Sequence, residues 1–320
     1  MENIFDMGVH TIFMGTPQFA EVILECLLHS PYRVVAVYSQ PDKPVGRGRE
    51  VAWSPVKRLA MEHKIPVIQP TTLKSVEAVE ELASFKPELI MVAAFGHILS
   101  QEVLSLPKFG CVNVHPSLLP QHRGPSPVAS ALLRGDQLTG VTIMLMDGGM
   151  DSGPILAQRE VGISLEDTTG SLTQKLAEIG AELLLETLPR WLDGELKPQP
   201  QDESQATYSK VITSEDGKID WHLPAVELWR RVRAYNPWPG CYTWWQGKRL
   251  KIHEAVPFSE AGNGEVGKVI ALPEPASVGV VTGRGILGLC QIQLEGKRRM
   301  GVGEFVRGQR NFIDSILGKI

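Results

Sequence analysis

Short apolar segments alternate with segments of helical spacing through the first half of the chain, and this alternation is the strongest constraint on its fold. The expected strands are residues 10–14, 33–38, 67–68, 89–93 and 111–114. They are mostly apolar and rich in β-branched residues, which is typical of parallel strands buried on both faces. Helical spacing between them, as at 73–84, supplies the crossovers that parallel strands need. We therefore expect an α/β fold with an open, mostly parallel, Rossmann-like sheet, whose ligand site lies beyond the carboxyl ends of the strands.

The turn after the first strand lacks the fingerprint of a dinucleotide-binding site. Gly15 ends the strand and Thr16 is expected to cap the next helix, but the second and third glycines are absent. The second strand runs into Ser39 and Gln40, without the acid that binds a ribose. Residues 283–288 match G-x-G-x-x-G, yet strand-like sequence on both sides favours a glycine-rich hairpin there. We therefore expect no nicotinamide cofactor.

The second half of the chain has a different character. A polar, proline-bearing segment at 196–205 is followed by a helix at about 224–235 and then by short strands broken by glycine. The expected strands are 249–252, 266–270 and 278–281. Such short strands with turn signals indicate a small C-terminal β-barrel, which we expect to be OB-like. The predicted organisation is a first domain at 1–193, a linker at 194–212 and a second domain at 213–320.

Charge divides along the same boundary. Residues 214–320 hold 15 Lys and Arg against 11 Asp and Glu, whereas the whole chain has a net charge of -4. A mildly basic second domain favours a local contact with nucleic acid, although ordinary scatter of charge explains the numbers equally well. A chain of negative net charge is not expected to bind RNA over its whole surface.

Neither a metal site nor a membrane segment is indicated. The four cysteines, at 26, 111, 241 and 290, form no C-x-x-C pair, which argues against a zinc site and a disulfide framework. Cys111 and Cys290 lie in apolar runs, and we interpret them as small buried side chains, with a thiol nucleophile as the minority alternative. The N-terminus has no basic region, and no apolar run approaches the ~20 residues of a membrane span. We expect a cytoplasmic protein with no membrane partner.

Chemistry-bearing residues gather at two successive strand ends. Asn113 and His115 end one strand, where period 2 places them on one face of the sheet. The next strand ends in a glycine-rich turn that holds Asp147 and Asp151. An imidazole can accept the proton of an attacking amine, an amide can stabilise the oxyanion that forms, and a carboxylate can tune the imidazole. These residues predict acyl transfer to an amine, whereas each of them taken alone is more often a turn or structural residue.

The two motifs resemble the signature of the folate-dependent formyltransferases. Residues 113–120 read Asn-Val-His-Pro-Ser-Leu-Leu-Pro, and residues 147–154 read Asp-Gly-Gly-Met-Asp-Ser-Gly-Pro. The resemblance implies the formyltransferase version of the fold, with Asn113, His115 and Asp151 as the catalytic residues. It extends over nearly the whole chain from Gly15 and shows no departure at these three positions. Residues before about 10 have no clear match.

The same resemblance implies a folate pocket. The donor would be 10-formyltetrahydrofolate, used as a substrate, with no permanently bound cofactor. Residues 94–99 match a segment that lines the pterin pocket in the family. The residues implied in folate binding are Phe95, His97, Ile98, Leu99, Ser117, Leu118, Leu119, Pro120, Asp147 and Gly148.

A basic segment at 40–49 follows the second strand and is long for a connection to a helix. Its Lys43, Arg47 and Arg49 lie among glycines and can become ordered against phosphates, although a solvated surface loop is the plain alternative. The segment resembles a loop that contacts the acceptor stem in the members of the family that act on methionyl-tRNA.

Two further segments resemble the same members. Residues 206–221, which include Lys210, are similar to their interdomain segment, and residues 233–240 are similar to the start of their C-terminal domain. The resemblance implies that Lys43, Arg47, Arg49 and Lys210 bind tRNA. The expected partners are methionyl-tRNA, that is, the initiator tRNA, and the folate donor, with no obligate protein partner.

Three alternatives stay open at this point. Another folate-dependent formyltransferase would act on a nucleotide-sugar amine or a purine precursor, and a related hydrolase would use water. A non-catalytic RNA-binding protein on the same scaffold is a different class, against which the three intact catalytic residues argue.

Overall fold

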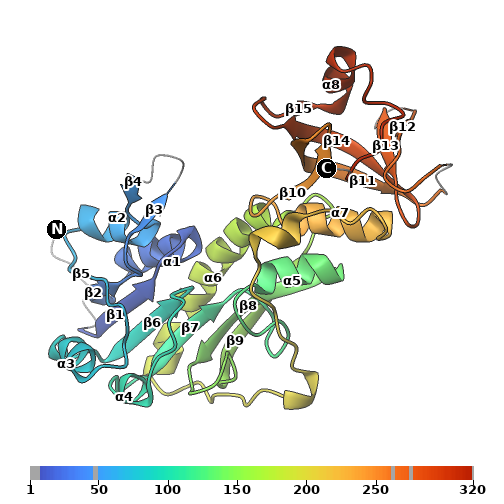
Figure 1. Cartoon of the computed structure of the whole chain (residues 1–320). Helices are drawn as coiled ribbons and strands as arrows, with labels where there is room; N and C mark the ends of the chain where they lie inside the picture. The colour runs from blue at the N-terminus through green and yellow to red at the C-terminus, as the bar shows by residue number, and fades with distance from the viewer. Residues whose placement is uncertain (1–7, 46–49, 261–263, 274–276, 319–320) are drawn as a thin grey trace. The chain divides into compact units, whose positions relative to one another are not determined.

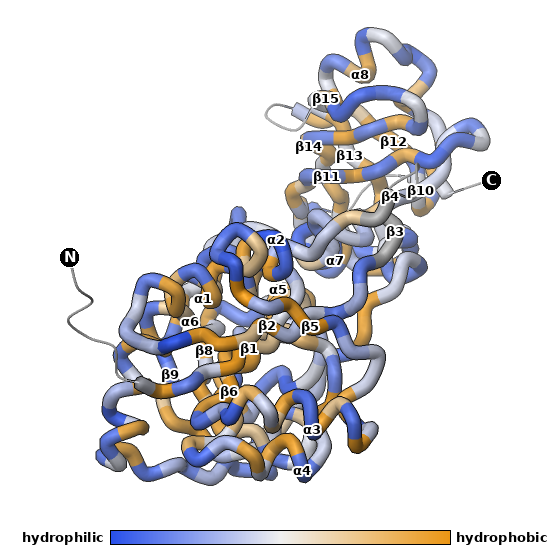
Figure 2. The backbone as a smooth tube through the Cα atoms, turned by 90° about the vertical axis from the view of Figure 1, so that its left-hand side faces the viewer, coloured by the Kyte–Doolittle hydropathy of each residue, from blue (hydrophilic) through white to orange (hydrophobic). Residues whose placement is uncertain are grey.

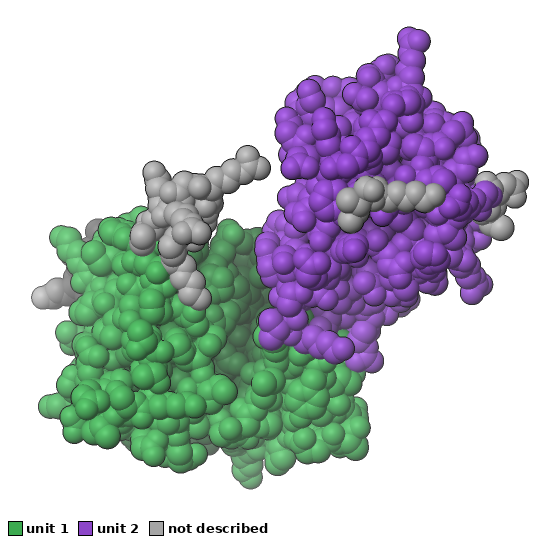
Figure 3. All heavy atoms as spheres, viewed as in Figure 1, with its two compact units in different colours: residues 1–127, 138–162, 173–209 green, residues 128–137, 163–172, 210–320 purple. Residues whose placement is uncertain are grey.

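The computed structural model describes residues 8–45, 50–260, 264–273 and 277–318. The chain forms two compact units, which Figure 3 colours separately. Unit 1 comprises Met1–Pro127, Leu138–Gly162 and Thr173–Ser209, and unit 2 comprises Val128–Gln137, Ile163–Leu172 and Lys210–Ile320. The domain and linker limits expected from the sequence stay a prediction.

Unit 1 is built on a seven-stranded sheet with the order β5-β2-β1-β6-β7-β8-β9 (Figure 1). Its strands are β1 (His10–Gly15), β2 (Arg33–Tyr38), β5 (Val67–Ile68), β6 (Leu89–Ala93), β7 (Cys111–His115), β8 (Leu138–Leu145) and β9 (Ile155–Gly162). The strands from β5 to β7 pair in parallel, whereas β8 and β9 pair antiparallel. The expected open, mostly parallel sheet is confirmed.

Helices cover both faces of this sheet. They are α1 (Gln18–Leu28), α2 (Pro55–Glu62), α3 (Val76–Ser84), α4 (Gln101–Leu104) and the part of α6 (Thr169–Leu192) that belongs to unit 1. Helix α5 (Pro127–Arg134) belongs almost wholly to unit 2. Alternate strand residues face opposite layers. Met14 of β1 belongs to one buried cluster with Leu82 of α3 and Val103 of α4. On the opposite face, Gly180 of α6 lies so close to β7 that a Cβ atom there would be 3.0 Å from Val114 Cγ1. Figure 2 shows the apolar character of the central strands.

The turn from β1 to α1 differs from the expectation in one respect. Pro17 is the N-cap of α1, and no side chain caps that helix, so the expected capping by Thr16 is wrong. The Thr16 hydroxyl instead accepts a hydrogen bond of 3.1 Å from the backbone N–H of Gln40, at the end of β2. Gly15 is required for close packing, because a Cβ atom there would lie 2.9 Å from the carbonyl oxygen of Ala93.

The basic segment after β2 contains regular structure. Strands β3 (Lys43–Val45) and β4 (Glu50–Ala52) pair antiparallel as a two-stranded sheet of their own. The predicted connecting loop is therefore a hairpin in its described part. At its base, Lys57 of α2 donates hydrogen bonds to Asp42 and Gln69. The four residues 46–49 lie outside the described residues.

Unit 2 contains an antiparallel sheet with the order β10-β11-β14-β13-β12, with β15 paired to β14. Its elements are η2 (Ser214–Gly217), α7 (Ala225–Ala234), β10 (Cys241–Trp245), β11 (Lys248–Phe258), β12 (Val269–Ala271), β13 (Val278–Val281), β14 (Ile286–Leu294), β15 (Met300–Gly301) and α8 (Val302–Gly308). Edge-to-face packing of Trp245, Phe305 and Phe312 builds its aromatic core. The sheet is consistent with the expected OB-like domain. Residues 283–288 span the turn from β13 to β14, which confirms the glycine-rich hairpin.

None of the helices in the described part of the chain has the length and apolar character that crossing a bilayer requires. The four cysteines are free. Cys111 is buried as expected, whereas Cys290, for which burial was also expected, is only half-buried; Cys241 is buried and Cys26 is half-buried.

Candidate active site

The candidate active site lies where β7 ends. Val114 faces α6, so the alternation of side chains turns Asn113 and His115 toward the opposite face of the sheet. Both are buried, with 7% and 4% of their surface exposed. The shared face predicted from the sequence is therefore present. Among the residues that the structure describes, none forms a hydrogen bond with the Asn113 side chain, which leaves its amide available to a ligand.

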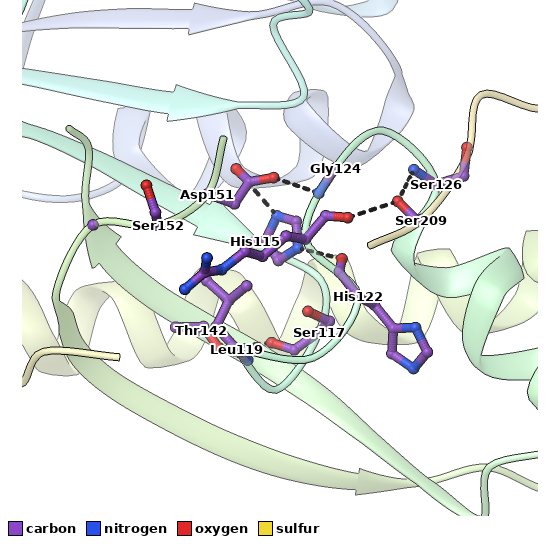
Figure 4. Close-up of polar contacts among 12 residues, drawn as sticks. His115, Ser117, Leu119, His122, Gly124, Ser126, Thr142, Asp151, Ser152 and Ser209 are labelled. Carbon is purple, nitrogen blue, oxygen red and sulfur yellow. Dashed lines mark hydrogen bonds and ion pairs between the residues drawn. The ribbon is translucent and has the colours of Figure 1, made fainter. Parts of the chain in front are cut away.

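His115 is held between a carbonyl and a carboxylate (Figure 4). Its Nε2 lies 3.2 Å from the carbonyl oxygen of His122, and its Nδ1 lies 3.8 Å from Oδ1 of Asp151. A carbonyl oxygen can only accept, so Nε2 carries the proton that is donated to it. In the neutral ring, Nδ1 is therefore the basic nitrogen, and it faces the Asp151 carboxylate.

Two opposing effects set the protonation of this ring. Burial lowers the pKa of His115, and it is the larger effect. The Asp151 carboxylate and the hydrogen bond to His122 act in the opposite direction, while the His122 ring lowers the pKa further. The net result is a lowered pKa, so His115 is neutral at neutral pH and able to accept a proton.

Asp151 comes from the turn after β8 and has a positive φ of 51°. This conformation is uncommon for a residue other than glycine and needs support from its surroundings. Part of the support comes from Gly124, whose backbone N–H donates a 2.7 Å hydrogen bond to Asp151 Oδ2. The loop at 122–124 therefore touches both His115 and Asp151, although no role was predicted for it from its sequence.

The predicted folate loop at 117–120 follows directly from β7. The Ser117 hydroxyl donates to the Gln121 carbonyl at 2.6 Å, so it holds the loop together. Thr142 of β8 donates to the Ser117 carbonyl and accepts from the Leu119 N–H. Gln158 of β9 donates to the Leu119 carbonyl at 2.9 Å. These two strand residues were not predicted, because nothing in their local sequence marks them.

The predicted pterin segment after β6 has both buried and exposed members. Phe95 and Leu99 belong to the core of unit 1, while Ile98 is 71% exposed. The ring of His97 lies 5.1 Å from that of Phe95, and its buried Nε2 has no partner in the described structure. Such an atom is available to a polar ligand.

Asp147 and Gly148 lie in the exposed part of the turn that carries Asp151. Asp147 accepts hydrogen bonds from the Gly149 N–H and the Ser152 hydroxyl, at 3.0 and 2.9 Å. These contacts stabilise the turn, and a role of Asp147 in folate binding stays a prediction.

The described structure does not test the predicted tRNA-binding residues, and their role stays a prediction. Arg47 and Arg49 lie outside the described residues. Lys43 begins β3, but its side chain also lies outside them. Lys210 is exposed and is the first residue of the last segment of unit 2. In the described ranges, no three His, Cys, Asp or Glu side chains are grouped as metal ligands would be.

Comparison with known proteins decides the family. A model of the formyl transferase family matches residues 8–188, and a model of the formyl transferase C-terminal domain matches residues 211–310. This chain belongs to the formyl transferase family. It is 47% identical over 297 residues to the methionyl-tRNA formyltransferase of Chloroflexus aurantiacus, covering 93% of this chain and 96% of that one. It is 48% identical to the methionyl-tRNA formyltransferase of Roseiflexus sp., covering 95% and 94%.

Solved structures share the fold at lower identity. An N-formyltransferase from Helicobacter canadensis, in complex with folinic acid and dTDP-3-aminofucose, is 18% identical with a TM-score of 0.63, covering 91% of this chain and all of that one. HypX from Aquifex aeolicus, in complex with tetrahydrofolic acid, is 22% identical with a TM-score of 0.60, covering 93% and 47%. The prediction of a formyl-transferring enzyme is confirmed. Enzymes of this family use 10-formyltetrahydrofolate as a donor substrate and not as a permanently bound cofactor.

Proposed function

We propose that this enzyme transfers the formyl group of 10-formyltetrahydrofolate to the amino group of methionyl-tRNA, the initiator tRNA, in the cytoplasm. The observation that carries the choice of acceptor is the similarity to relatives named methionyl-tRNA formyltransferase, at 47–48% identity over more than nine tenths of each chain. The antiparallel OB-like sheet of unit 2 supports it, because such sheets commonly bind nucleic acids. The enzyme works without an obligate protein partner.

The reaction begins when the amino nitrogen of the methionyl group attacks the formyl carbon. His115 takes up the amine proton at Nδ1, since its Nε2 is occupied by the carbonyl of His122. The Asn113 amide donates a hydrogen bond to the oxyanion of the tetrahedral intermediate. No covalent enzyme intermediate is required, because the amine itself is the nucleophile.

Collapse of the intermediate completes the transfer. The carbonyl re-forms, the bond from carbon to N10 of the folate breaks, and N10 takes the proton from His115. The products are formylmethionyl-tRNA and tetrahydrofolate, and His115 returns to its neutral form. Asp151 stabilises the imidazolium between the two proton transfers, because its carboxylate lies 3.8 Å from Nδ1.

The acceptor is tested by direct competition. Formylation of methionyl-tRNA, free methionine and a nucleotide-sugar amine is measured with 10-formyltetrahydrofolate as the only donor. We expect methionyl-tRNA to be favoured in kcat/KM by at least ~10³-fold, because the small amines cannot use contacts that the tRNA body makes. Preferential formylation of the sugar amine would replace this proposal by a sugar N-formyltransferase. Formyl release to water, unchanged by any of the three amines, would indicate a hydrolase.

A further inference from the structure

The guanidinium of Arg123 is buried next to the candidate active site without touching the predicted catalytic side chains. Its side chain is 1% exposed. Nε and Nη2 donate to Oε1 of Gln201 at 3.1 and 2.9 Å. Nη1 and Nη2 also donate to the two carboxylate oxygens of Glu203, at 2.9 and 2.7 Å. Burying a cation costs free energy unless the cation is paired and hydrogen-bonded, so the partners of this guanidinium should explain why it is buried.

The ion pair with Glu203 does not by itself explain the burial of Arg123. The Glu203 side chain is 67% exposed, and ion pairs with an exposed partner contribute only about 0–1 kcal/mol. A second partner, the Tyr208 hydroxyl at 3.3 Å from Nη1, belongs to a residue that is exposed as well. The third partner is Gln201, which is half-buried and whose amide also faces the turn that carries Asp151.

Gln201 connects the guanidinium to that turn. Its Nε2 donates to the carbonyl oxygens of Asp151 and Gly153, at 2.8 and 2.7 Å. A guanidinium can only donate, so the Gln201 oxygen must face Arg123 and the Gln201 nitrogen must face the two carbonyls. Arg123 therefore fixes which way round the amide lies. The amide in turn clamps the backbone of Asp151, whose positive φ needs such support.

The backbone on both sides of Arg123 hydrogen-bonds to His115 and Asp151. The carbonyl of His122 accepts from His115, and the N–H of Gly124 donates to Asp151. Arg123 itself is held by the segment of Gln201: its N–H donates to the Thr207 carbonyl at 2.8 Å, and its carbonyl accepts from the Ser209 N–H at 2.7 Å. Side chain and backbone together make one frame around the His115–Asp151 contact.

We propose that Arg123 and Gln201 are positioning residues for formyl transfer: Arg123 orients the Gln201 amide, and Gln201 holds the Asp151 turn so that its carboxylate stays at Nδ1 of His115. The inference rests on the proposed function, in which Asp151 assists His115.

The test is a double-mutant cycle between Gln201→Leu and Asp151→Asn, with Gln205→Leu as the matched control. Gln205 lies four residues along the same segment, and its exposed amide donates to Asp202 instead of the turn. We expect Gln201→Leu to lower kcat for methionyl-tRNA by about tenfold, the scale for a small misplacement of a catalytic group. In the Asp151→Asn background the same substitution should cost less than about twofold, because the carboxylate it positions is gone.

A second measurement separates positioning from general loosening and needs no acceptor. The His115 imidazole is titrated by NMR in the free enzyme. The charged and titratable groups that face it are Asp151 and His122. Releasing the Asp151 turn weakens the effect that raises the pKa, so Gln201→Leu should move the His115 titration to lower pH. Gln205→Leu should leave both the titration and the melting temperature in place. Gln201→Leu should lower the melting temperature, because the buried guanidinium loses an acceptor, but it should still unfold in one cooperative transition above the assay temperature.

Each outcome decides the inference. Gln201→Leu within about twofold of the wild type, or an equal loss in both backgrounds, overturns the positioning role while leaving the proposed function standing. Near-wild-type turnover of Asp151→Asn overturns the positioning role, because Asp151 would then not assist His115, whereas failure of the wild type to formylate methionyl-tRNA would overturn the proposed function itself. If Gln201→Leu yields no folded protein, Gln201→Glu takes its place in the same cycle, because it keeps the acceptor for Arg123 but loses both donors to the turn. Full activity of that variant would show that Gln201 only satisfies the buried guanidinium.

Discussion

Replacing Asp151 by asparagine isolates the charge of the carboxylate. Asparagine has the same shape and keeps an oxygen that can accept from the Gly124 N–H, so the turn should keep its conformation. The change therefore removes one negative charge at 3.8 Å from Nδ1 of His115 and little else.

The geometry gives the size of the effect. Two unit charges at this separation interact with about 4 kcal/mol at an effective dielectric constant near 20. The ring is only partly protonated in the transition state, and Asp151 is 19% exposed to solvent, so a fraction of that energy applies. We expect the transfer rate to fall by about 10²-fold, which corresponds to about 2.8 kcal/mol at roughly 1.4 kcal/mol for each factor of ten.

The same substitution should also shift the pH dependence of the transfer rate in a defined direction. Neutral His115 is the active form, so the rate rises with pH as the ring loses its proton. Removing the carboxylate lowers the pKa of His115 further, because the charge that opposed the effect of burial is gone. The acid limb of the profile should therefore move to lower pH while the plateau falls.

Single-turnover formylation of methionyl-tRNA between about pH 5 and 9 covers this range. Glu186→Gln is a charge-matched control, because Glu186 is an exposed carboxylate of unit 1 that pairs with Arg159. A plateau within about tenfold of the wild type would reduce Asp151 to a turn residue. An acid limb that stays in place, or moves to higher pH, would refute the electrostatic argument even if the rate fell.

Three further predictions concern donors, partners and metals. Asn113→Ala should lower the transfer rate by about 10²–10³-fold with little change in folate affinity, the scale for losing an oxyanion donor; folate binding by fluorescence and steady-state rates check this, and near-wild-type turnover would remove the residue from the mechanism. Arg47→Ala should sharply reduce formylation of methionyl-tRNA, leave folate binding nearly intact and flatten the log–log salt dependence of tRNA binding by about one unit; an equal loss with a small amine acceptor would place Arg47 in the chemical site instead. Activity should survive exhaustive chelation, measured with a small amine acceptor to avoid effects on tRNA folding; loss on chelation and recovery with one divalent ion would contradict this.

Local periodicity was sufficient to predict the five parallel strands of unit 1, whereas β3, β4 and β9 were not predicted. The segment at 33–38, for example, is β2 residue for residue, because a run of apolar and β-branched residues has few alternatives inside an α/β sheet. The convergence of Asn113 and His115 was also predictable, since period 2 and the topology of parallel strands fix the edge and the face.

Contacts between distant segments were not predictable in the same way. Gln201 lies 50 residues from Asp151, and no local pattern marks their hydrogen bond. The cap expected of Thr16 failed for a related reason: its hydroxyl has a tertiary partner at Gln40, which competes with the local one. The segment after β2 was expected to be a loop, yet its described residues pair as β3 and β4, and no local pattern had marked this cross-strand pairing.

The frame around Arg123 limits how this enzyme can be divided or recombined. The chain stays in unit 1 after the last strand of the seven-stranded sheet. It continues to Ser209 and hydrogen-bonds there to Arg123, in the loop at 122–124. A fragment that stops at residue 193 would keep every strand of the sheet and the three predicted catalytic residues, but would lose Gln201, Thr207 and Ser209. A working graft of a foreign acceptor-binding module therefore has its junction after Ser209, and any chimera joined earlier must bring its own substitute for this stretch of chain.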